Sequence, residues 1–311
     1  MSNRNEKYLY IVNYPKFEEE LCMMEMREVF NKKPENKVFT SNIEFNQSSS
    51  PFIKNRLDII YEEDSLESIL ENIKREKLSF EKFKVEYLKL EEGNVPYNER
   101  LHAVREIGFV ITGFPDIHNP EISIGVTRYN GKWLLGINKR NDYEWHMHDK
   151  KPCSYSNSLS TRVAKSIVNI ANKGDLDVKI IDPCCGVGTT LIEGLSIGAD
   201  ICGCEINPQI ACNAKRNLEF FGLEQRVTKG SMHDLKEKFQ VSIIDIPYGL
   251  FTKTTEQEQS DIIKTARRIS DKMIIITFED MSKMIDEAGF KIIDTCKVCK
   301  GQFIRYVSIC I

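Results

Sequence analysis

Short apolar runs recur at regular intervals in the second half of the chain. They occupy residues 178–181, 199–203, 241–246 and 273–278, and helix-like segments lie between them. Strand and helix alternating at this spacing predict a parallel sheet with helices on both faces and right-handed connections.

The last two apolar runs, at residues 291–298 and 303–311, are separated only by a short link. A parallel crossover needs a dozen or more residues, so this pair is expected to form an antiparallel hairpin. A terminal antiparallel hairpin on an otherwise parallel sheet distinguishes the fold of S-adenosylmethionine (SAM) methyltransferases from an ordinary dinucleotide-binding domain.

The first half of the chain has a less regular pattern. Apolar residues at helical spacing predict a helix over residues 64–75, and residues 101–113 are expected to form a helix that runs into a strand. Asn130-Gly131 is a strong hairpin signal. Alternating stretches predict strands at residues 7–13, 56–61, 82–90, 122–128 and 133–138. We therefore expect an α+β domain over residues 1–145 and an α/β domain over residues 146–311.

Composition is that of an ordinary globular protein. The 311 residues exceed the roughly 100–200 typical of one domain, and 41% are hydrophobic and 29% charged. No apolar run approaches the roughly 18 residues needed to cross a bilayer, and the chain does not begin with a signal-peptide hydrophobic region. The ten cysteines do not follow the spacing of a disulfide framework, which favours reduced thiols. We expect a cytoplasmic protein.

Two short motifs have the spacing of metal ligands, but neither is complete. Cys296-x-x-Cys299 lacks a second pair, and His146-x-His148 lacks an obvious third ligand. We therefore predict no metal site. The formal net charge of −3 weighs against a nucleic-acid partner, because phosphate neutralisation normally supplies most of the affinity. Net charge does not describe local patches, so such a partner stays possible.

A buried strand is expected to end at Asp182 and to open through two glycines into a helix. The segment reads Ile-Ile-Asp-Pro-Cys-Cys-Gly-Val-Gly-Thr-Thr over residues 180–190. Glycines allow a sharp turn and close approach to a ligand at the carboxyl end of a strand, where such sheets bind cofactors. Leu191 replaces the third small residue of the dinucleotide fingerprint, and Asp182 can attract an ammonium group, so the pattern favours SAM. The predicted cofactor-binding residues here are Asp182, Cys184, Gly186, Gly188, Thr189 and Thr190.

Acidic residues also follow the next two predicted strands. Glu205 is placed to accept hydrogen bonds from both ribose hydroxyls, and Asp234 to accept one from the adenine amino group. Any single acid could instead be a helix N-cap or a solvated loop end. Three acids at successive strand ends favour a cofactor site. This second set of predicted cofactor-binding residues is Glu205, Ile206, His233 and Asp234.

The fourth strand ends in Asp245-Ile246-Pro247-Tyr248, which we take as the catalytic residues. The motif resembles the Asp/Asn-Pro-Pro-Tyr motif of amino-methyltransferases, and Pro247 stiffens the backbone. An aromatic amine is a poor nucleophile because its lone pair is delocalised. Hydrogen bonds to the Asp245 carboxylate and the Ile246 carbonyl would orient that lone pair, while Tyr248 would stack on the base for roughly 1–3 kcal/mol. A strand–turn with an aromatic plug is the alternative reading.

The second half of the chain, roughly residues 146–311, is similar to the THUMP-domain-containing tRNA guanine-N2 methyltransferases, a family of class I SAM-dependent RNA methyltransferases. Residues 151–159 resemble the segment that helps to wall the SAM pocket in that family, which adds Ser156 to the expected cofactor-binding residues. Residues 114–121, followed by a hairpin, look like the end of a THUMP domain.

The resemblance implies a Rossmann-like domain that binds SAM, preceded by a THUMP-like RNA-binding domain. It implies methylation of an exocyclic amine of a base in RNA, most of all guanine N2 in tRNA. The target base must leave its stack, and a domain that grips RNA by shape would supply the binding energy. Two alternatives remain open. One is methylation of another planar nitrogen, in ribosomal RNA guanine, DNA adenine or protein glutamine, and the other is a SAM- and RNA-binding protein without turnover.

Overall fold

The computed structural model describes residues 6–91, 95–154, 158–247, 254–300 and 303–311. The chain folds into two compact units, and each unit is assembled from three separate stretches of the sequence. Unit 1 contains Met1–Asn13, Lys32–Ser48 and Phe52–Asp142, and unit 2 contains Tyr14–Asn31, Ser49–Pro51 and Tyr143–Ile311. No helix among the described residues is long and apolar enough to cross a membrane.

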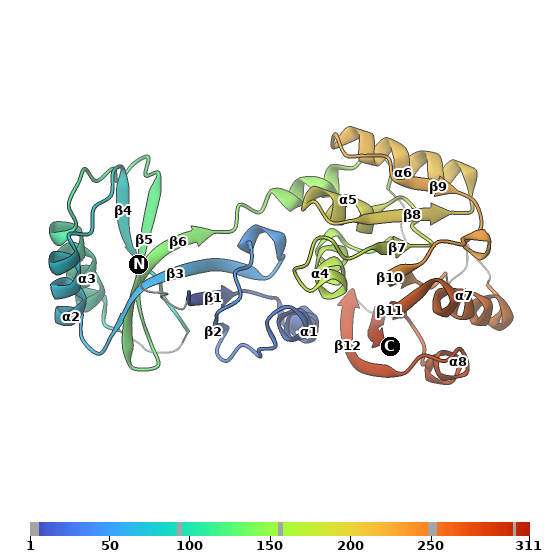
Figure 1. Ribbon diagram of the computed structural model, residues 1–311, viewed down its shortest axis with the longest axis horizontal. Coiled ribbons are helices and arrows are strands. Elements are labelled where there is room, and N and C mark those ends of the chain that lie inside the picture. The colour runs from blue at the N-terminus through green and yellow to red at the C-terminus, as the bar shows by residue number, and fades with distance from the viewer. Residues whose placement is uncertain (1–5, 92–94, 155–157, 248–253, 301–302) are drawn as a thin grey trace. The chain divides into compact units, whose positions relative to one another are not determined.

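Unit 1 is built on a six-stranded sheet in the order β2-β1-β3-β6-β5-β4. Helices α2 (Leu66–Glu76) and α3 (Tyr97–Val110) lie side by side against it (Figure 1), and Ile69, Ile73 and Ile107 are buried in the shared core. β4 and β5 pair in parallel, and the other neighbours are antiparallel. The strands are β1 (Tyr8–Val12), β2 (Val38–Ser41), β3 (Ile53–Glu63), β4 (Phe83–Tyr87), β5 (Ile122–Tyr129) and β6 (Lys132–Arg140).

Local sequence explains two of the element ends in unit 1. The Ser65 side chain caps α2 by accepting from the Ser68 backbone N–H at 3.1 Å. Asn130 and Gly131 both have positive φ, 49° and 79°, as the tight turn between β5 and β6 requires. The predicted helix over residues 101–113 instead begins at Tyr97 and ends at Val110. The strand β2 was not predicted from the sequence pattern.

Unit 2 contains a seven-stranded sheet in the order β12-β13-β11-β10-β7-β8-β9. β13 is antiparallel to both of its neighbours, and the other pairs are parallel, so the predicted parallel sheet with a terminal hairpin is confirmed. The strands are β7 (Ile180–Asp182), β8 (Ile201–Glu205), β9 (Val227–Lys229), β10 (Phe239–Asp245), β11 (Ser270–Thr277), β12 (Ile292–Lys300) and β13 (Phe303–Cys310).

Helices cover both faces of this sheet. Met273 and Ile275 of β11 pack in one core with residues of α7 and α8, while Ile274 and Ile276 alternate with them and are also fully buried. The helices are α1 (Glu19–Phe30), α4 (Thr161–Asn172), α5 (Thr189–Ser196), α6 (Pro208–Phe220), α7 (Glu256–Ile269) and α8 (Ser282–Glu287). Short 3-10 helices are η1 (Lys16–Glu18), η2 (Gln47–Ser49), η3 (Glu144–Lys150) and η4 (Met232–Asp234).

The helix α1 belongs to unit 2, although the sequence analysis placed residues 1–145 in the N-terminal domain. Its charged residues pair with the strands of the second sheet. Arg27 Nη2 lies 2.6 Å from Asp294 Oδ2, and Lys272 Nζ lies 3.0 Å from Glu28 Oε2. A further residue of α1, Glu25, is fully buried and accepts from Asn169 Nδ2 of α4 at 2.9 Å.

The pKa values of these two glutamates of α1, three positions apart, are shifted in opposite directions. Burial raises the pKa of Glu25 to about 7, against hydrogen bonds and the charge of Lys165. Burial acts in the same direction on Glu28, but Lys173 and Lys272 outweigh it and lower the pKa of that carboxyl. At neutral to alkaline pH the Glu25 charge therefore opposes folding, and the Glu28 charge supports it.

We expect Glu25→Gln to stabilise unit 2 at pH 8 and to have less effect at pH 5. As pH rises from 4.5 to 7, the unfolded chain ionises while folded Glu25 keeps its proton, so the cost of Glu25 grows to a few kcal/mol at most, about 1.4 kcal/mol per unit of pKa. Calorimetric unfolding of both proteins at the two pH values measures this. The matched control, Glu28→Gln, should destabilise at pH 8. A Glu25→Gln protein less stable than wild type at pH 8 would contradict the prediction.

Candidate active site

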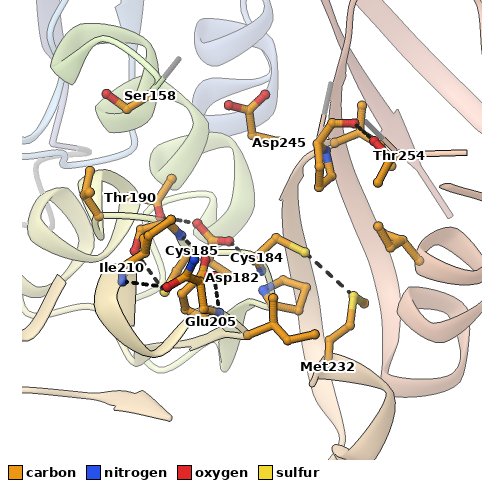
Figure 2. A pocket seen from close by; sticks show the side chains of 18 of the residues that line it. Ser158, Asp182, Cys184, Cys185, Thr190, Glu205, Ile210, Met232, Asp245 and Thr254 are labelled. Atoms are coloured by element: carbon orange, nitrogen blue, oxygen red, sulfur yellow. Dashed lines mark hydrogen bonds between the residues drawn. The ribbon is translucent and has the colours of Figure 1, made fainter. Parts of the chain in front are cut away.

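A cavity of about 580 Å³ opens in unit 2 at the carboxyl ends of three parallel strands, β7, β8 and β10. Figure 2 shows that Asp182, Glu205 and Asp245, the last residues of these strands, surround it. Open α/β sheets bind ligands at this edge. The volume lies within the range of about 300–1,000 Å³ that is usual for small-molecule sites.

The Asp182 carboxylate organises the glycine-rich loop that follows β7. Thr190 Oγ1 donates to Oδ2, and the Cys184 backbone N–H donates to Oδ1 at 3.2 Å. Gly186 and Gly188 adopt positive φ values of 54° and 81°, which favour glycine. The loop then enters α5 at Thr189. The turn therefore depends both on the two glycines and on the carboxylate beneath them.

Asp182 is buried beside two further carboxylates. Burial raises its pKa to about 7, and the charges of Asp245 and Glu205 act in the same direction, whereas its hydrogen bonds from Thr190 and Cys184 lower it. A cationic group placed beside Asp182 would favour the ionised form. The site is thus prepared to take a positive charge.

Glu205 joins the end of β8 to the glycine-rich loop. Its Oε2 accepts from the Gly186 backbone N–H at 3.0 Å, and its Oε1 accepts from the Asn207 backbone N–H at 2.8 Å. Each carboxylate oxygen can accept more than one hydrogen bond, so both can still receive ligand hydroxyls. Ile206, 71% exposed, lines the cavity beside Glu205.

The turn η4 contributes another part of the cavity wall. The His233 Nδ1 lies 2.6 Å from Thr265 Oγ1 of α7, and the His233 carbonyl accepts from Arg268 Nη2 at 2.9 Å. Met232 Sδ lies 3.8 Å from Cys184 Sγ across the cavity wall, as Figure 2 shows. Asp234 is exposed and is not among the cavity-lining residues in the described part of the chain, so its contact with adenine stays a prediction.

Asp245, Ile246 and Pro247 line the cavity together. The Ile246 backbone N–H donates to the Ile276 carbonyl at 3.1 Å, which fixes this segment to β11. The Pro247 carbonyl accepts from Thr254 Oγ1 at 2.6 Å. Asp245 is half-buried, and its Oδ2 lies 3.7 Å from Arg305 Nη1. The backbone that carries the expected amine acceptors is therefore held on two sides.

Most of the predicted site residues meet at this cavity. Ser156 and Tyr248 lie outside the described residues, and Gly188 shapes the loop without lining the cavity in the described part of the chain. Met232, Thr254 and Glu258 are among the lining residues that were not predicted from the sequence. A capping-box pattern, Thr255-x-x-Glu258, marks the start of α7 and could have brought Glu258 to attention. The predicted residues that line the cavity are Asp182, Cys184, Gly186, Thr189, Thr190, Glu205, Ile206, His233, Asp245, Ile246 and Pro247.

The cavity wall is acidic. Among the described lining residues the charged side chains are Asp182, Glu205, Asp245 and Glu258, and none is lysine or arginine. Low-dielectric walls of one charge sign concentrate ligands of the opposite sign. The cavity therefore suits a small molecule with a net positive charge better than a phosphate-bearing dinucleotide.

Comparisons with known proteins agree with this chemistry. Residues 148–300 match the family UPF0020, described as "RMKL-like, methyltransferase domain". The tRNA (guanine(10)-N2)-dimethyltransferase of Methanothermobacter thermautotrophicus is 28% identical over 213 residues, 65% of this chain and 62% of the relative. The enzyme of the same name from Pyrococcus abyssi is 27% identical over 217 residues, 62% of this chain and 64% of the relative. This chain thus spans less than two thirds of the length of these relatives.

A solved structure resembles the chain over nearly its whole length. The crystal structure of TrmN from Thermus thermophilus aligns with 98% of this chain and 99% of its own, at 13% identity and a TM-score of 0.48.

The family match covers every described residue that lines the cavity, from Ser158 to Ile262. The prediction of a methyltransferase domain is confirmed, and SAM is the cofactor that this assignment supports. The part of the chain that holds the cavity is the part that matches the methyltransferase-domain family UPF0020.

Proposed function

We propose that this protein is an enzyme that transfers a methyl group from SAM to an exocyclic amine of a base in RNA, specifically to guanine N2 in tRNA. The observation that carries the proposal is the position of Asp245, Ile246 and Pro247 on the same cavity as Asp182 and Glu205. Hydrogen-bond acceptors suited to a planar amine and carboxylates suited to the cofactor therefore line the same cavity. The names of the two archaeal relatives support guanine N2 of tRNA as the target.

Binding of the cofactor rests on the acids at the strand ends. Asp182 takes the ammonium group, and Glu205 accepts from the ribose hydroxyls while its backbone partners keep the loop in place. His233 and Asp234, in the turn η4, take the adenine side. Bound SAM supplies an electrophilic methyl group on a sulfonium sulfur.

Catalysis by the chain's own residues is mainly a matter of position. The two N–H groups of the target amine donate to the Asp245 carboxylate and the Ile246 carbonyl, which directs the nitrogen lone pair at the methyl group. With SAM bound, the new N–C bond would form as the S–C bond breaks, and one amine proton would leave afterwards to solvent. Tyr248 would stack on the base.

Unit 1 is proposed to be a THUMP-like domain that grips the RNA and so supports removal of the base from its stack. Its six-stranded sheet packs against the helices α2 and α3, which gives unit 1 a hydrophobic core of its own. All ten cysteines lie in the described residues and are unpaired, which is consistent with a reducing, cytoplasmic location.

The experiment that tests this proposal is transfer of labelled methyl from SAM to tRNA that lacks its own modifications, followed by nucleoside analysis. We expect N2-methylguanosine. Methyl transfer to ribosomal RNA, DNA or protein in the same assay would instead identify another planar nitrogen as the target. SAM binding without transfer to any of these substrates would contradict an enzymatic function.

We expect Asp245→Ala to lower methyl transfer by about 100-fold or more, because a misplaced nucleophile costs roughly that much. SAM affinity should stay within a few-fold of wild type, since Asp245 faces the base. Single-turnover transfer and calorimetric SAM binding measure the two quantities. Asp245→Asn is the matched control, because its amide oxygen can still accept, and it should retain more activity. Wild-type rates in the alanine variant would refute this role of Asp245.

Glu205→Ala should weaken SAM binding by roughly tenfold or more, since hydrogen bonds to a charged group contribute about 1.5–3 kcal/mol. Calorimetry measures the dissociation constant of this variant and of Asp245→Ala, a change in the same cavity that should leave SAM affinity within a few-fold of wild type. An unchanged dissociation constant for Glu205→Ala would mean that the ribose contact is misassigned.

SAM binding should also depend on pH through Asp182. With a pKa of about 7 in the cofactor-free protein, Asp182 holds a proton below that pH and must release it to pair with an ammonium group. The dissociation constant should therefore rise about tenfold per unit as pH falls below 7, and level off above it. Calorimetry between pH 5.5 and 7.5 measures this dependence, which Asp182→Asn should remove. Affinity that does not change with pH in the wild type would argue against the contact.

A further inference from the structure

Strand register places Arg305 at the same sheet edge as Asp245. Asp245 pairs with Ile276 in β11, and the next residue of β11, Thr277, pairs with Tyr306 in β13. Because β13 is antiparallel to β11, Arg305, which precedes Tyr306 in the chain, lies one position further toward the carboxyl ends of the parallel strands. One strand therefore separates the two residues, and a long side chain can bridge it.

Arg305 is buried, with 7% of its surface exposed, and contacts two groups that stabilise a positive charge. Its Nη1 lies 3.7 Å from Asp245 Oδ2, and its guanidinium carbon lies 5.1 Å from the centre of the Phe278 ring. A buried guanidinium needs such partners because loss of hydration is costly. Arg305 does not line the cavity among the described residues, so it reaches Asp245 from outside the wall.

The charges around Asp245 explain why a cation is needed there. Asp182 of β7 and Glu205 of β8 converge on the same cavity, so carboxylates from two neighbouring strands lie near Asp245, and Glu258 of α7 and His233 of η4 line the cavity too. The thiol of Cys184 is a further titratable neighbour. Repulsion among these groups would favour protonation of Asp245, and Arg305 is a cation that opposes it.

We propose that Arg305 is a positioning residue that keeps Asp245 ionised and fixes its oxygens for the target amine. This inference rests on the function proposed above. An ionised carboxylate offers only acceptors, whereas a protonated one would present a donor to an amine that must itself donate. Arg305 thus acts through Asp245 and needs no contact with substrate or cofactor.

The test compares the pH dependence of methyl transfer in wild type, Arg305→Met and Arg305→Lys. Removal of the charge should move the acid limb of kcat upward by about 1–3 pH units, the shift that a neighbouring arginine causes in an aspartate. The KM for SAM should stay within about twofold, and Arg305→Lys should keep most of the wild-type profile. Equal loss of activity at every pH in Arg305→Met would indicate a structural role and overturn the proposal.

Two controls make the result specific. Arg226→Met removes another arginine of unit 2, one that pairs with Asp200 at 2.7 Å at the amino ends of β8 and β9, and should leave the pH profile unchanged. In an Asp245→Asn background no carboxylate remains to be kept ionised, so Arg305→Met should not shift the acid limb. A shift of the same size there would contradict action through Asp245.

A measurement without turnover separates this inference from the proposed function. Carboxyl-carbon NMR of the cofactor-free protein follows ionisation of Asp245, with Asp245→Asn identifying its signal. Arg305→Met should raise the Asp245 pKa by about 1–3 units. An unchanged pKa overturns the inference even if the wild type methylates RNA. A raised pKa in a protein that methylates nothing supports the ion pair while the proposed function fails.

Discussion

Mutual repulsion of carboxylates within one small cavity is the constraint on which the site depends. Asp182, Glu205 and Asp245 come from different strands, yet the parallel sheet delivers all three to one edge. Each is stabilised differently. Asp182 accepts from a hydroxyl and a backbone N–H, Glu205 accepts from two backbone N–H groups, and Asp245 has an arginine beside it. The resulting negative field suits a sulfonium cofactor, and a product that has lost that charge should be held less tightly.

The glycine-rich loop shows how one contact can serve both fold and ligand. Gly186 donates its backbone N–H to Glu205, so the acid proposed to bind the ribose and the glycine-rich loop hold each other in place. A change at either residue will therefore affect both. Second contacts of this kind are the usual means by which a binding site is kept in its productive geometry.

Much of unit 2 could be predicted because its information is local. Apolar runs, the glycine pair after Asp182 and the short link before β13 each determine a structure within a few residues. The role of Arg305 could not be predicted, because its contact with Asp245 depends on the register of an antiparallel strand 60 residues further along the chain. The place of α1 was missed for a related reason. Its buried Glu25 looks like one more surface charge in the sequence, and its hydrogen bond with Asn169 of α4 shows that it faces inward.

Strand order has a consequence for biosynthesis. Among the described residues β12 joins the sheet through β13, which lies between it and β11 although it follows both in the chain. While the ribosome is still adding residues 303–310, β11 has an open edge of unpaired backbone groups and β12 has no partner in the sheet. Open edges of hydrophobic strands are where nascent chains associate wrongly. We infer that this domain completes its sheet in a late step and that the interval before it is when the growing chain most needs protection.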